Sequence, residues 1–349
     1  MVVTTAPALT MRGLVPILFG HAAFQQLNAA CELGLFECLH SAPGASAESI
    51  AAGTGLSTHS AQVLLLGTTS LGLTTKGPDG YQNCAIVEEA FREGSWPVLR
   101  AIVEFQAKIA YLPAMDYAES LRTGENIGIR HFPGDTRDLY TRLANTEGLE
   151  QLFYRCMNSW STLSNPVLLE GVDYSQVQRV LDVGGGDAVN AIALASAHEH
   201  LRITVLDRPG ALDVAKEKIA QHGLADRIDT HAADLFDDAY PTGYDCVLFA
   251  HQLVIWTPEQ NKALLGKAFD AMADGQRVLI FNAFSDDDGT GPLYAGLDSV
   301  YFSTLPFRGS TLYPWRDYEE WLRHCGFSRI NRITIDSWTP HGVIEAYKG

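Results

Sequence analysis

The sequence VLDVGGG, residues 180–186, joins a short apolar run to an acidic residue and a glycine-rich turn. Residues 188–197 follow at helical spacing and are rich in alanine. A strand, a tight turn and a helix in this order form the first unit of a doubly wound sheet, whose ligands bind beyond the carboxyl ends of the strands. The dinucleotide pattern GxGxxG stops at its third glycine, where Val189 stands. The sequence therefore predicts a ligand site here without identifying a dinucleotide.

The pattern of residue types across the whole C-terminal half supports this interpretation. From Val177 onward, β-branched runs alternate with helical stretches, which predicts a parallel, doubly wound α/β sheet. The seven runs are RVLDVGGG, LRITVLD, RIDTHAADLF, YDCVLFAH, RVLIFNAF, SRINRITID and GVIEAYK. We expect this α/β domain over residues 166–349, and a mainly helical domain over residues 1–165 that contributes part of an acceptor pocket.

Acidic residues stand where the predicted strands end. Asp207 closes the second run about twenty residues after the glycine turn, where a carboxylate can bind both ribose hydroxyls. Asp234 follows the third run and precedes two apolar residues, Leu235 and Phe236, that could sandwich a purine ring. Asp182 would repel a pyrophosphate but attract a ligand that carries an ammonium and a sulfonium. The predicted ligand is therefore a cationic nucleoside.

The N-terminal region predicts association rather than nucleic-acid binding. Residues 14–40 are apolar on more than one helical face, which favours a buried interface and hence an intertwined homodimer. Residues 46–84 predict two short helices and a hairpin that turns at 78–80, the pattern of a winged helix. A recognition helix needs basic or amide side chains, and residues 57–73 contain no Lys or Arg. DNA binding is therefore disfavoured.

Composition excludes further classes. Among 349 residues, 25 are Lys or Arg and 41 are Asp or Glu, which gives a formal net charge of −16 that repels phosphate backbones. The first twenty residues fit neither a secretory signal nor a membrane span, so we expect a cytoplasmic protein.

Six cysteines without a CxxC pair predict reduced thiols. The acidic run 286–288 lies in a Gly-rich turn, and we expect no metal requirement.

The segments that carry a resemblance to a known family are LDVGGGDA, VLDRP, AADLF, FAHQLVIWTPEQNKALL and FYRCMNSWS. Nearly the whole chain resembles the class I S-adenosylmethionine-dependent methyltransferases. Within them it is similar to the dimeric plant caffeic-acid-type and bacterial antibiotic O-methyltransferases. The resemblance implies S-adenosylmethionine as cofactor and a small aromatic metabolite of secondary metabolism as acceptor. The residues that it places at the cofactor are Asp182, Gly184, Gly186, Asp207, Arg208, Asp234, Leu235, Phe236 and Ala250.

One departure from the family concerns the catalytic base. Family O-methyltransferases show Leu-His-Asp-Trp after the fourth strand, with the His as general base, whereas this chain has Leu253-Val254-Ile255-Trp256. Asn282 and Tyr313 stand where the family has two supporting Glu residues. General-base catalysis contributes about 10² to 10⁴ in rate when a hydroxyl must lose its proton. The loss favours a carbon or nitrogen acceptor, or a hydroxyl acidic enough to ionise unaided.

Three alternatives stay open. His251, one turn before the lost base, could act as a relocated base for O-methylation, and His341 could also approach the site. The bound cofactor could instead serve as a scaffold for hydroxylation, decarboxylation or a pericyclic reaction without methyl transfer. A regulatory protein built on the winged helix would lack the basic surface that it needs. For the acceptor pocket we expect five residues: Met157, Trp160, Trp256, Asp298 and Phe302.

Overall fold

A computed structural model describes residues 9–349 of the chain. It contains two compact units, the first ending at Ala107 and the second covering Lys108–Gly349. The expected boundary at residue 165 therefore differs from the division of the structure. The reason is that helix α10 (Leu149–Glu170) packs against helix α11 (Val189–Ala197) and strand β9 (His341–Lys348) of the α/β sheet, which brings the segment before it into the second unit.

The first unit is helical with one small hairpin. Its helices are α1 (Met11–Leu18), α2 (Gly20–Glu32), α3 (Leu35–Ser41), α4 (Ala47–Thr54), α5 (Thr58–Ser70), α6 (Ala85–Arg92) and α7 (Trp96–Phe105), and strands β1 (Thr74–Gly77) and β2 (Gly80–Asn83) pair antiparallel. Ser46 and Ser57 start α4 and α5 because their hydroxyls accept backbone N–H groups of the first turn. The predicted winged-helix order of two helices and a hairpin is confirmed.

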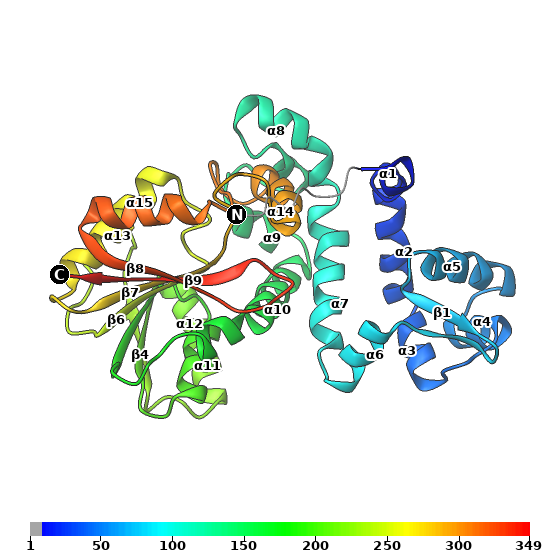
Figure 1. Cartoon of the computed structure of the whole chain (residues 1–349), viewed down its shortest axis with the longest axis horizontal. Coiled ribbons are helices and arrows are strands. Elements are labelled where there is room, and N and C mark those ends of the chain that lie inside the picture. The colour runs from blue at the N-terminus through cyan, green and yellow to red at the C-terminus, as the bar shows by residue number, and fades with distance from the viewer. Residues whose placement is uncertain (1–8) are drawn as a thin grey trace. The chain divides into compact units, whose positions relative to one another are not determined.

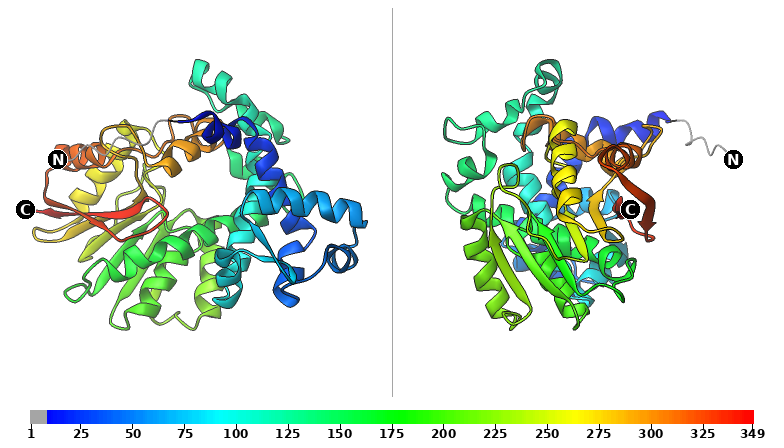
Figure 2. Two further views of the ribbon diagram at one scale, coloured as in Figure 1. Left: turned by 45° about the vertical axis from the view of Figure 1, so that its right-hand side comes forward. Right: turned by 90° about the vertical axis from the view of Figure 1, so that its left-hand side faces the viewer.

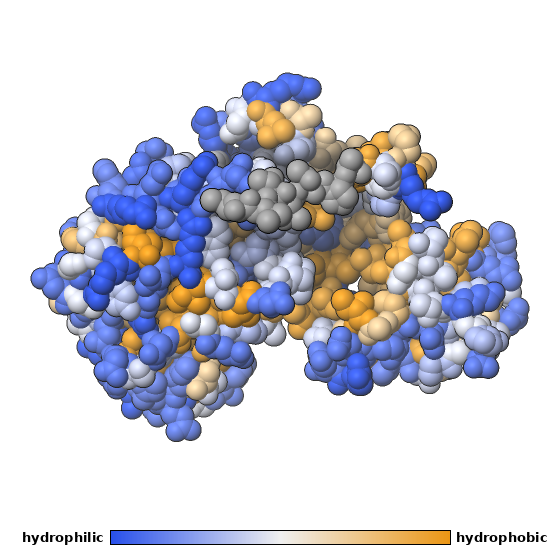
Figure 3. All heavy atoms as spheres, viewed as in Figure 1, coloured by the Kyte–Doolittle hydropathy of each residue, from blue (hydrophilic) through white to orange (hydrophobic). Residues whose placement is uncertain are grey.

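Helix α1 presents apolar side chains to the surface. Met11, Ile17, Leu18 and Phe19 are each more than half exposed, and Figure 3 shows apolar residues gathered where Figure 1 labels α1. Within the same unit, α2 and α3 bury Ala30, Cys31 and their neighbours in a core with α5. An exposed apolar helix beside a filled core is typical of an interaction surface.

The second unit is an α/β domain with a helical approach segment. Before the sheet come helix α8 (Tyr117–Thr123), two 3₁₀ helices (Pro113–Asp116 and Ile127–His131), α9 (Leu139–Ala144) and α10. The strands are β3 (Arg179–Val183), β4 (Arg202–Asp207), β5 (Ile228–Ala232), β6 (Cys246–Ala250), β7 (Arg277–Ala283), β8 (Phe327–Thr334) and β9, and the remaining helices are α11, α12 (Pro209–Gln221), α13 (Pro258–Ala271), α14 (Leu293–Thr304) and α15 (Trp315–Cys325).

The seven predicted runs form one sheet in the order β5-β4-β3-β6-β7-β9-β8. Strands β3 to β7 are parallel, and β9 is antiparallel to both of its neighbours. Successive residues of β3 are buried on opposite faces, Val180 with α10, α11 and α12, and Leu181 with α13 and α15. Figures 1 and 2 show these helices on both faces of the sheet. The prediction of a doubly wound α/β domain is confirmed.

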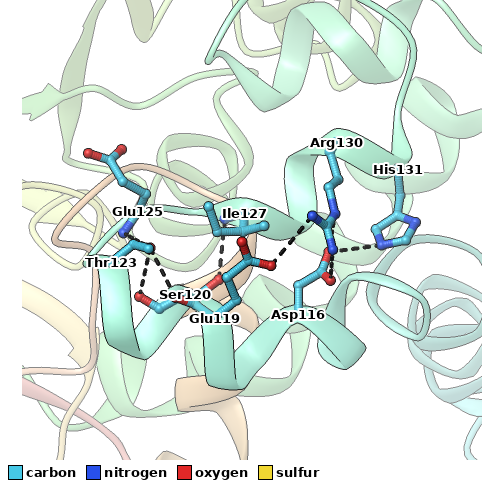
Figure 4. A network of polar contacts seen from close by, with 8 residues as sticks. All are labelled: Asp116, Glu119, Ser120, Thr123, Glu125, Ile127, Arg130 and His131. Atoms are coloured by element: carbon cyan, nitrogen blue, oxygen red, sulfur yellow. Dashed lines mark hydrogen bonds and ion pairs between the residues drawn. The ribbon is translucent and has the colours of Figure 1, made fainter.

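A charged network holds the segment around α8 (Figure 4). Asp116 is buried, and its carboxylate accepts from Arg130 Nε at 3.0 Å and Nη2 at 2.5 Å, and lies 2.9 Å from His131 Nε2. This segment contacts helix α14, because Asn126 Nδ2 donates to the carbonyl of Phe302 at 3.0 Å. Charge-assisted bidentate pairs are among the stronger hydrogen bonds. The network therefore stabilises the segment against which α14 packs.

No helix between residues 9 and 349 is both long and apolar enough to cross a membrane. The six cysteines all have free thiols. Within the same residues, no three His, Cys, Asp or Glu side chains gather in a way that could hold a metal ion.

Candidate active site

The glycine turn after β3 is fixed by Asp207 at the end of the neighbouring strand β4. Gly184 and Gly186 have φ values of +71° and +56°, a region that glycine enters without steric cost. The Asp207 carboxylate accepts from Gly186 N at 2.9 Å and from Arg208 N at 2.7 Å. Arg208 itself is exposed at the start of α12. Asp207 therefore stands at the strand end with its orientation already set by backbone donors.

Asp182 lies directly beneath this turn. Its side chain is fully buried, neither carboxyl oxygen has a hydrogen-bond partner among the described residues, and a Cβ on Gly185 would come within 2.4 Å of Oδ2. Burial, together with the nearby Asp207 charge, raises the pKa of Asp182 to about 7. A cation bound at the turn would satisfy this carboxyl and favour its ionised form.

The segment after β5 forms an acidic turn backed by aromatic rings. Asp234 is exposed and accepts from Phe236 N at 2.8 Å and Asp237 N at 3.1 Å, which lowers its pKa. Leu235 is buried beside it, and the Phe236 ring meets Trp256 at a centroid distance of 5.0 Å. The geometry brings a carboxylate and flat apolar surfaces together at the strand end.

Gln252 joins the glycine turn to Trp256, although nothing in the sequence pattern indicated it. Its Nε2 donates to the carbonyl of Gly184 at 3.2 Å, and its Oε1 accepts from Trp256 Nε1 at 2.9 Å. Trp256 also stacks on Phe307 at 5.3 Å. The predicted acceptor residue Trp256 thus lies with Phe236 and the turn.

A second aromatic group forms where α10, α14 and the start of β9 meet. The Trp160 ring lies 5.5 Å from Tyr294 and 5.7 Å from Trp338. Asp298 lies one turn after Tyr294 on α14, and burial raises the pKa of Asp298 to about 7, against the smaller opposing effect of the Tyr294 hydroxyl. Met157 is half-buried on α10, three residues before Trp160. The sequence placed Trp160 and Asp298 here but gave no indication of Trp338.

The position of the family's base is apolar in the structure as well. Val254 is 6% exposed and packs in a cluster with Ala283, Phe302 and Leu312. The two residues at the supporting positions are both hydrogen-bonded within the protein. Asn282 Nδ2 donates to the Tyr318 hydroxyl at 3.3 Å, and the Tyr313 hydroxyl donates to the carbonyl of Trp256 at 2.9 Å. No proton acceptor is therefore available at position 254.

Two histidines lie at the ends of the strands on either side of β7. His251 follows β6, and His341 begins β9, which is antiparallel and so starts where β6 and β7 end. The ring centroids are 5.3 Å apart, and His251 lies 4.5 Å from Phe281. Burial lowers the pKa of His251 to about 4, and burial together with the neighbouring His251 holds the pKa of His341 well below its usual value, so both imidazoles are neutral at pH 7. Ala250, the last residue of β6, is buried.

The sheet order and the acidic strand ends define a class I S-adenosylmethionine-dependent methyltransferase. The chain belongs to the O-methyltransferase family: the model of the O-methyltransferase domain matches residues 116–328, and that of the O-methyltransferase dimerisation domain matches residues 15–87. It is a methyltransferase of small molecules in secondary metabolism.

Three known proteins illustrate the similarity. The L-tyrosine C(3)-methyltransferase of Streptomyces lavendulae is 47% identical over 342 residues, which cover 97% of this chain and 93% of that protein. The crystal structure of the S-adenosylmethionine-dependent methyltransferase SibL in its apo form is 64% identical, with a TM-score of 0.91 over 97% of this chain and 99% of that one. Human N-acetylserotonin methyltransferase in complex with S-adenosylmethionine is 25% identical, with a TM-score of 0.82 over the full length of both chains.

The residues at the strand ends fit S-adenosylmethionine. The unpartnered carboxyl of Asp182 suits a cationic group, the Asp207 carboxylate suits ribose hydroxyls, and the apolar surfaces beside Asp234 suit a purine. When bound, the cofactor supplies an activated methyl group, so the protein has to position the acceptor and manage its proton.

Proposed function

We propose that this enzyme methylates a ring carbon of a phenolic aromatic amino acid, with L-tyrosine as the model acceptor. The observation that carries the proposal is the apolar environment of Val254, which leaves no base at the position where family members deprotonate a hydroxyl that becomes methylated. The similarity to an L-tyrosine C(3)-methyltransferase over nearly the whole chain supports the same acceptor class.

The chemistry of a phenol makes this acceptor reasonable. A phenol ring is electron-rich at the carbons next to the hydroxyl, so one of these carbons can attack the methyl group in line as the S–CH₃ bond breaks. The ring then loses the proton of that carbon and regains aromaticity. In such a reaction, the hydroxyl is a directing group and the alignment of the carbon decides the product. Attack at carbon therefore does not require a base on the line of methyl transfer.

We further propose roles for the residues at the strand ends. Asp207 binds the ribose hydroxyls, Asp234 with Leu235 and Phe236 holds the adenine, and Asp182 with Gly184 and Gly186 faces the cationic amino-acid part. Arg208 N orients Asp207, and Ala250 contributes backbone contact. The supporting evidence is that strands β5, β4, β3 and β6 are adjacent and bring all of these residues to one edge of the sheet.

The acceptor is held on the other side by α10 and α14. Met157, Trp160 and Phe302 provide apolar walls, Trp256 closes the cofactor side, and Asp298 binds the ammonium group of the amino acid. A carboxylate beside a cation ionises more readily, so acceptor binding lowers the raised pKa of Asp298. We also propose that the enzyme is a homodimer associated through its first unit, as the dimerisation-domain match and the exposed apolar side chains of α1 favour.

The test is to incubate the purified enzyme with methyl-labelled S-adenosylmethionine and L-tyrosine and to locate the label by fragmentation mass spectrometry. We expect label on the aromatic ring and formation of S-adenosylhomocysteine in equal amount. Label on the phenol oxygen would contradict the proposal, as would product formation without consumption of the methyl group. The Asp298→Asn variant should raise KM for L-tyrosine and leave cofactor affinity unchanged. Light scattering of the same preparation tests the dimer.

A further inference from the structure

The pair His251–His341 carries two unsatisfied polar atoms where β6 ends and β9 begins. Nε2 of His251 and Nδ1 of His341 are inaccessible to solvent and have no hydrogen-bond partner among the described residues. Leaving a buried polar group without a partner costs about 1–3 kcal/mol. Each such group calls for an explanation, and a role in catalysis, where a bound ligand supplies the missing partner, is one of them.

The backbone around His251 is also unusual. Its φ is +56°, one of three positive values among the non-glycine residues 9–349, and its N–H donates to the carbonyl of Phe281 at 2.7 Å. This bond ties the backbone of the residue to the end of β7, and its ring contacts that of His341 at the start of β9. Strained conformations of this kind cluster at functional sites.

We infer that His251 accepts the proton of the acceptor's hydroxyl during carbon methylation, and that His341 positions it and stabilises the resulting imidazolium. This inference rests on the proposed function, since it assigns the proton acceptor for that reaction. His251 touches the substrate in this scheme, whereas His341 acts through His251 and is a positioning residue.

The proton and electron balance is complete with one proton released. In the first step, the hydroxyl O–H bond breaks, its proton moves to His251, and the oxygen electron pair is delocalised onto the neighbouring ring carbon. That carbon forms the new C–CH₃ bond while the S–CH₃ bond breaks and its electron pair stays on sulfur. In the second step, the ring C–H proton leaves to water, the ring regains aromaticity, and His251 returns its proton to the oxygen.

The neutral state of both imidazoles is what this role requires. The Tyr294 ring lies 6.4 Å from that of His341, and the carboxyl of Asp298, one turn later on α14, is a titratable group beyond it. The rings that contact His251 are Phe281 from β7 and His341 from β9. Burial disfavours a lone imidazolium, but the cost falls when a phenolate faces it and the pair is neutral overall.

A spectroscopic experiment measures the loss of this proton from the bound phenol directly. The enzyme saturated with S-adenosylhomocysteine is titrated with 3-nitro-L-tyrosine, whose phenolate absorbs visible light, and ionisation of the bound phenol is followed against pH. We expect the bound phenol to ionise at lower pH than the free one. His251→Gln should raise that pH by about one unit or more, and His341→Gln should raise it by less. His324→Gln, which changes an exposed histidine of α15, is the matched control.

Turnover gives the second measurement. His251→Gln should reduce labelling of L-tyrosine by about 10² or more, and 3-fluoro-L-tyrosine, whose phenol ionises more readily, should recover much of the loss. Equal ionisation of bound nitrotyrosine in the wild type and His251→Gln overturns the inference, as does failure of the probe to bind. Ring labelling by His251→Gln at the wild-type rate also overturns it.

The two proposals fail in different ways. A lowered ionisation pH that depends on His251, together with label on the oxygen, would remove the proposed carbon acceptor and keep His251 as the proton acceptor. Ring labelling that does not depend on His251 would keep the proposed carbon acceptor and remove His251 as the proton acceptor. Binding of S-adenosylhomocysteine by each variant shows that the fold is intact.

Discussion

The edge of the sheet at which β3 to β7 end has two halves that differ in how closely they keep the family pattern. In the half formed by β5, β4 and β3, every acidic position is present, and Asp207 is already bonded to the glycine turn. In the half formed by β6, β7 and β9, the base is replaced by Val254, and two neutral histidines stand nearby. Under the proposed assignments, cofactor binding draws mainly on the strand ends of the first half and acceptor chemistry on those of the second, so one can change while the other is kept.

The largest effect on ligand binding is expected in the half formed by β5, β4 and β3. Asp207→Ala removes the acceptor of two backbone N–H groups and, in the proposed function, of the ribose hydroxyls. Hydrogen bonds to a charged group contribute about 1.5–3 kcal/mol, so we expect S-adenosylhomocysteine to bind about 100-fold more weakly or worse, measured by calorimetry. The matched control is Asp213→Ala, an exposed residue on α12. A change of less than tenfold would break the assignment of this half to the cofactor.

The second prediction restores a base in the other half. Val254→His places an imidazole where the family's base stands, next to Phe302. If the loss of that base selects carbon over oxygen, the variant should give O-methylated L-tyrosine that the wild type does not form, with cofactor affinity within about threefold. Fragmentation mass spectrometry measures the ratio of the two products. Val254→Leu controls for the change of volume, and an unchanged ratio in Val254→His would show that position 254 does not decide the methylated atom.

How far the sequence predicts each half follows from the same comparison. The seven strands and the acidic strand ends could be predicted because each is a local pattern that ends in a turn residue. The pairing of His251 with His341 could not, because it depends on β9 running antiparallel beside β7, a non-local feature. Gln252 and Trp338 act through contacts with distant segments that leave no period in the sequence. The expected boundary at 165 differed because α10 packs on the sheet.

A smaller effect is expected from the buried carboxyl of Asp182. Its pKa is raised from 3.8 to about 7, so below pH 7 the folded protein holds a proton that a bound cation must displace. Affinity for S-adenosylmethionine should therefore fall by up to about tenfold for each pH unit below 7, and Asp182→Asn should flatten this dependence in calorimetric titrations between pH 5.5 and 8.

Stability without cofactor should change with the opposite sign. Between about pH 4 and 7, the folded state binds more protons at Asp182 than the unfolded state does, so the free energy of unfolding decreases as pH rises, by about 4 kcal/mol over the interval. His251, with its pKa lowered to about 4, contributes the reverse slope between pH 4 and 6.5. The difference between the wild type and Asp182→Asn in chemical denaturation isolates the carboxyl. Parallel curves would refute the raised pKa.

The smallest effect on catalysis is expected from the network that supports the acceptor half. Asp116→Asn removes the charge that Arg130 and His131 share and should lower the free energy of unfolding by about 1–3 kcal/mol. Glu119→Gln, whose carboxylate is half exposed in its ion pair with Arg130, should cost less than about 1 kcal/mol. Because the network holds α14 and not β3 to β5, KM for the acceptor should rise in Asp116→Asn while cofactor affinity stays the same. Weaker binding of both acceptor and cofactor in Asp116→Asn would mean that the two halves of the edge are mechanically coupled. Thermal denaturation in the presence of each ligand distinguishes these outcomes.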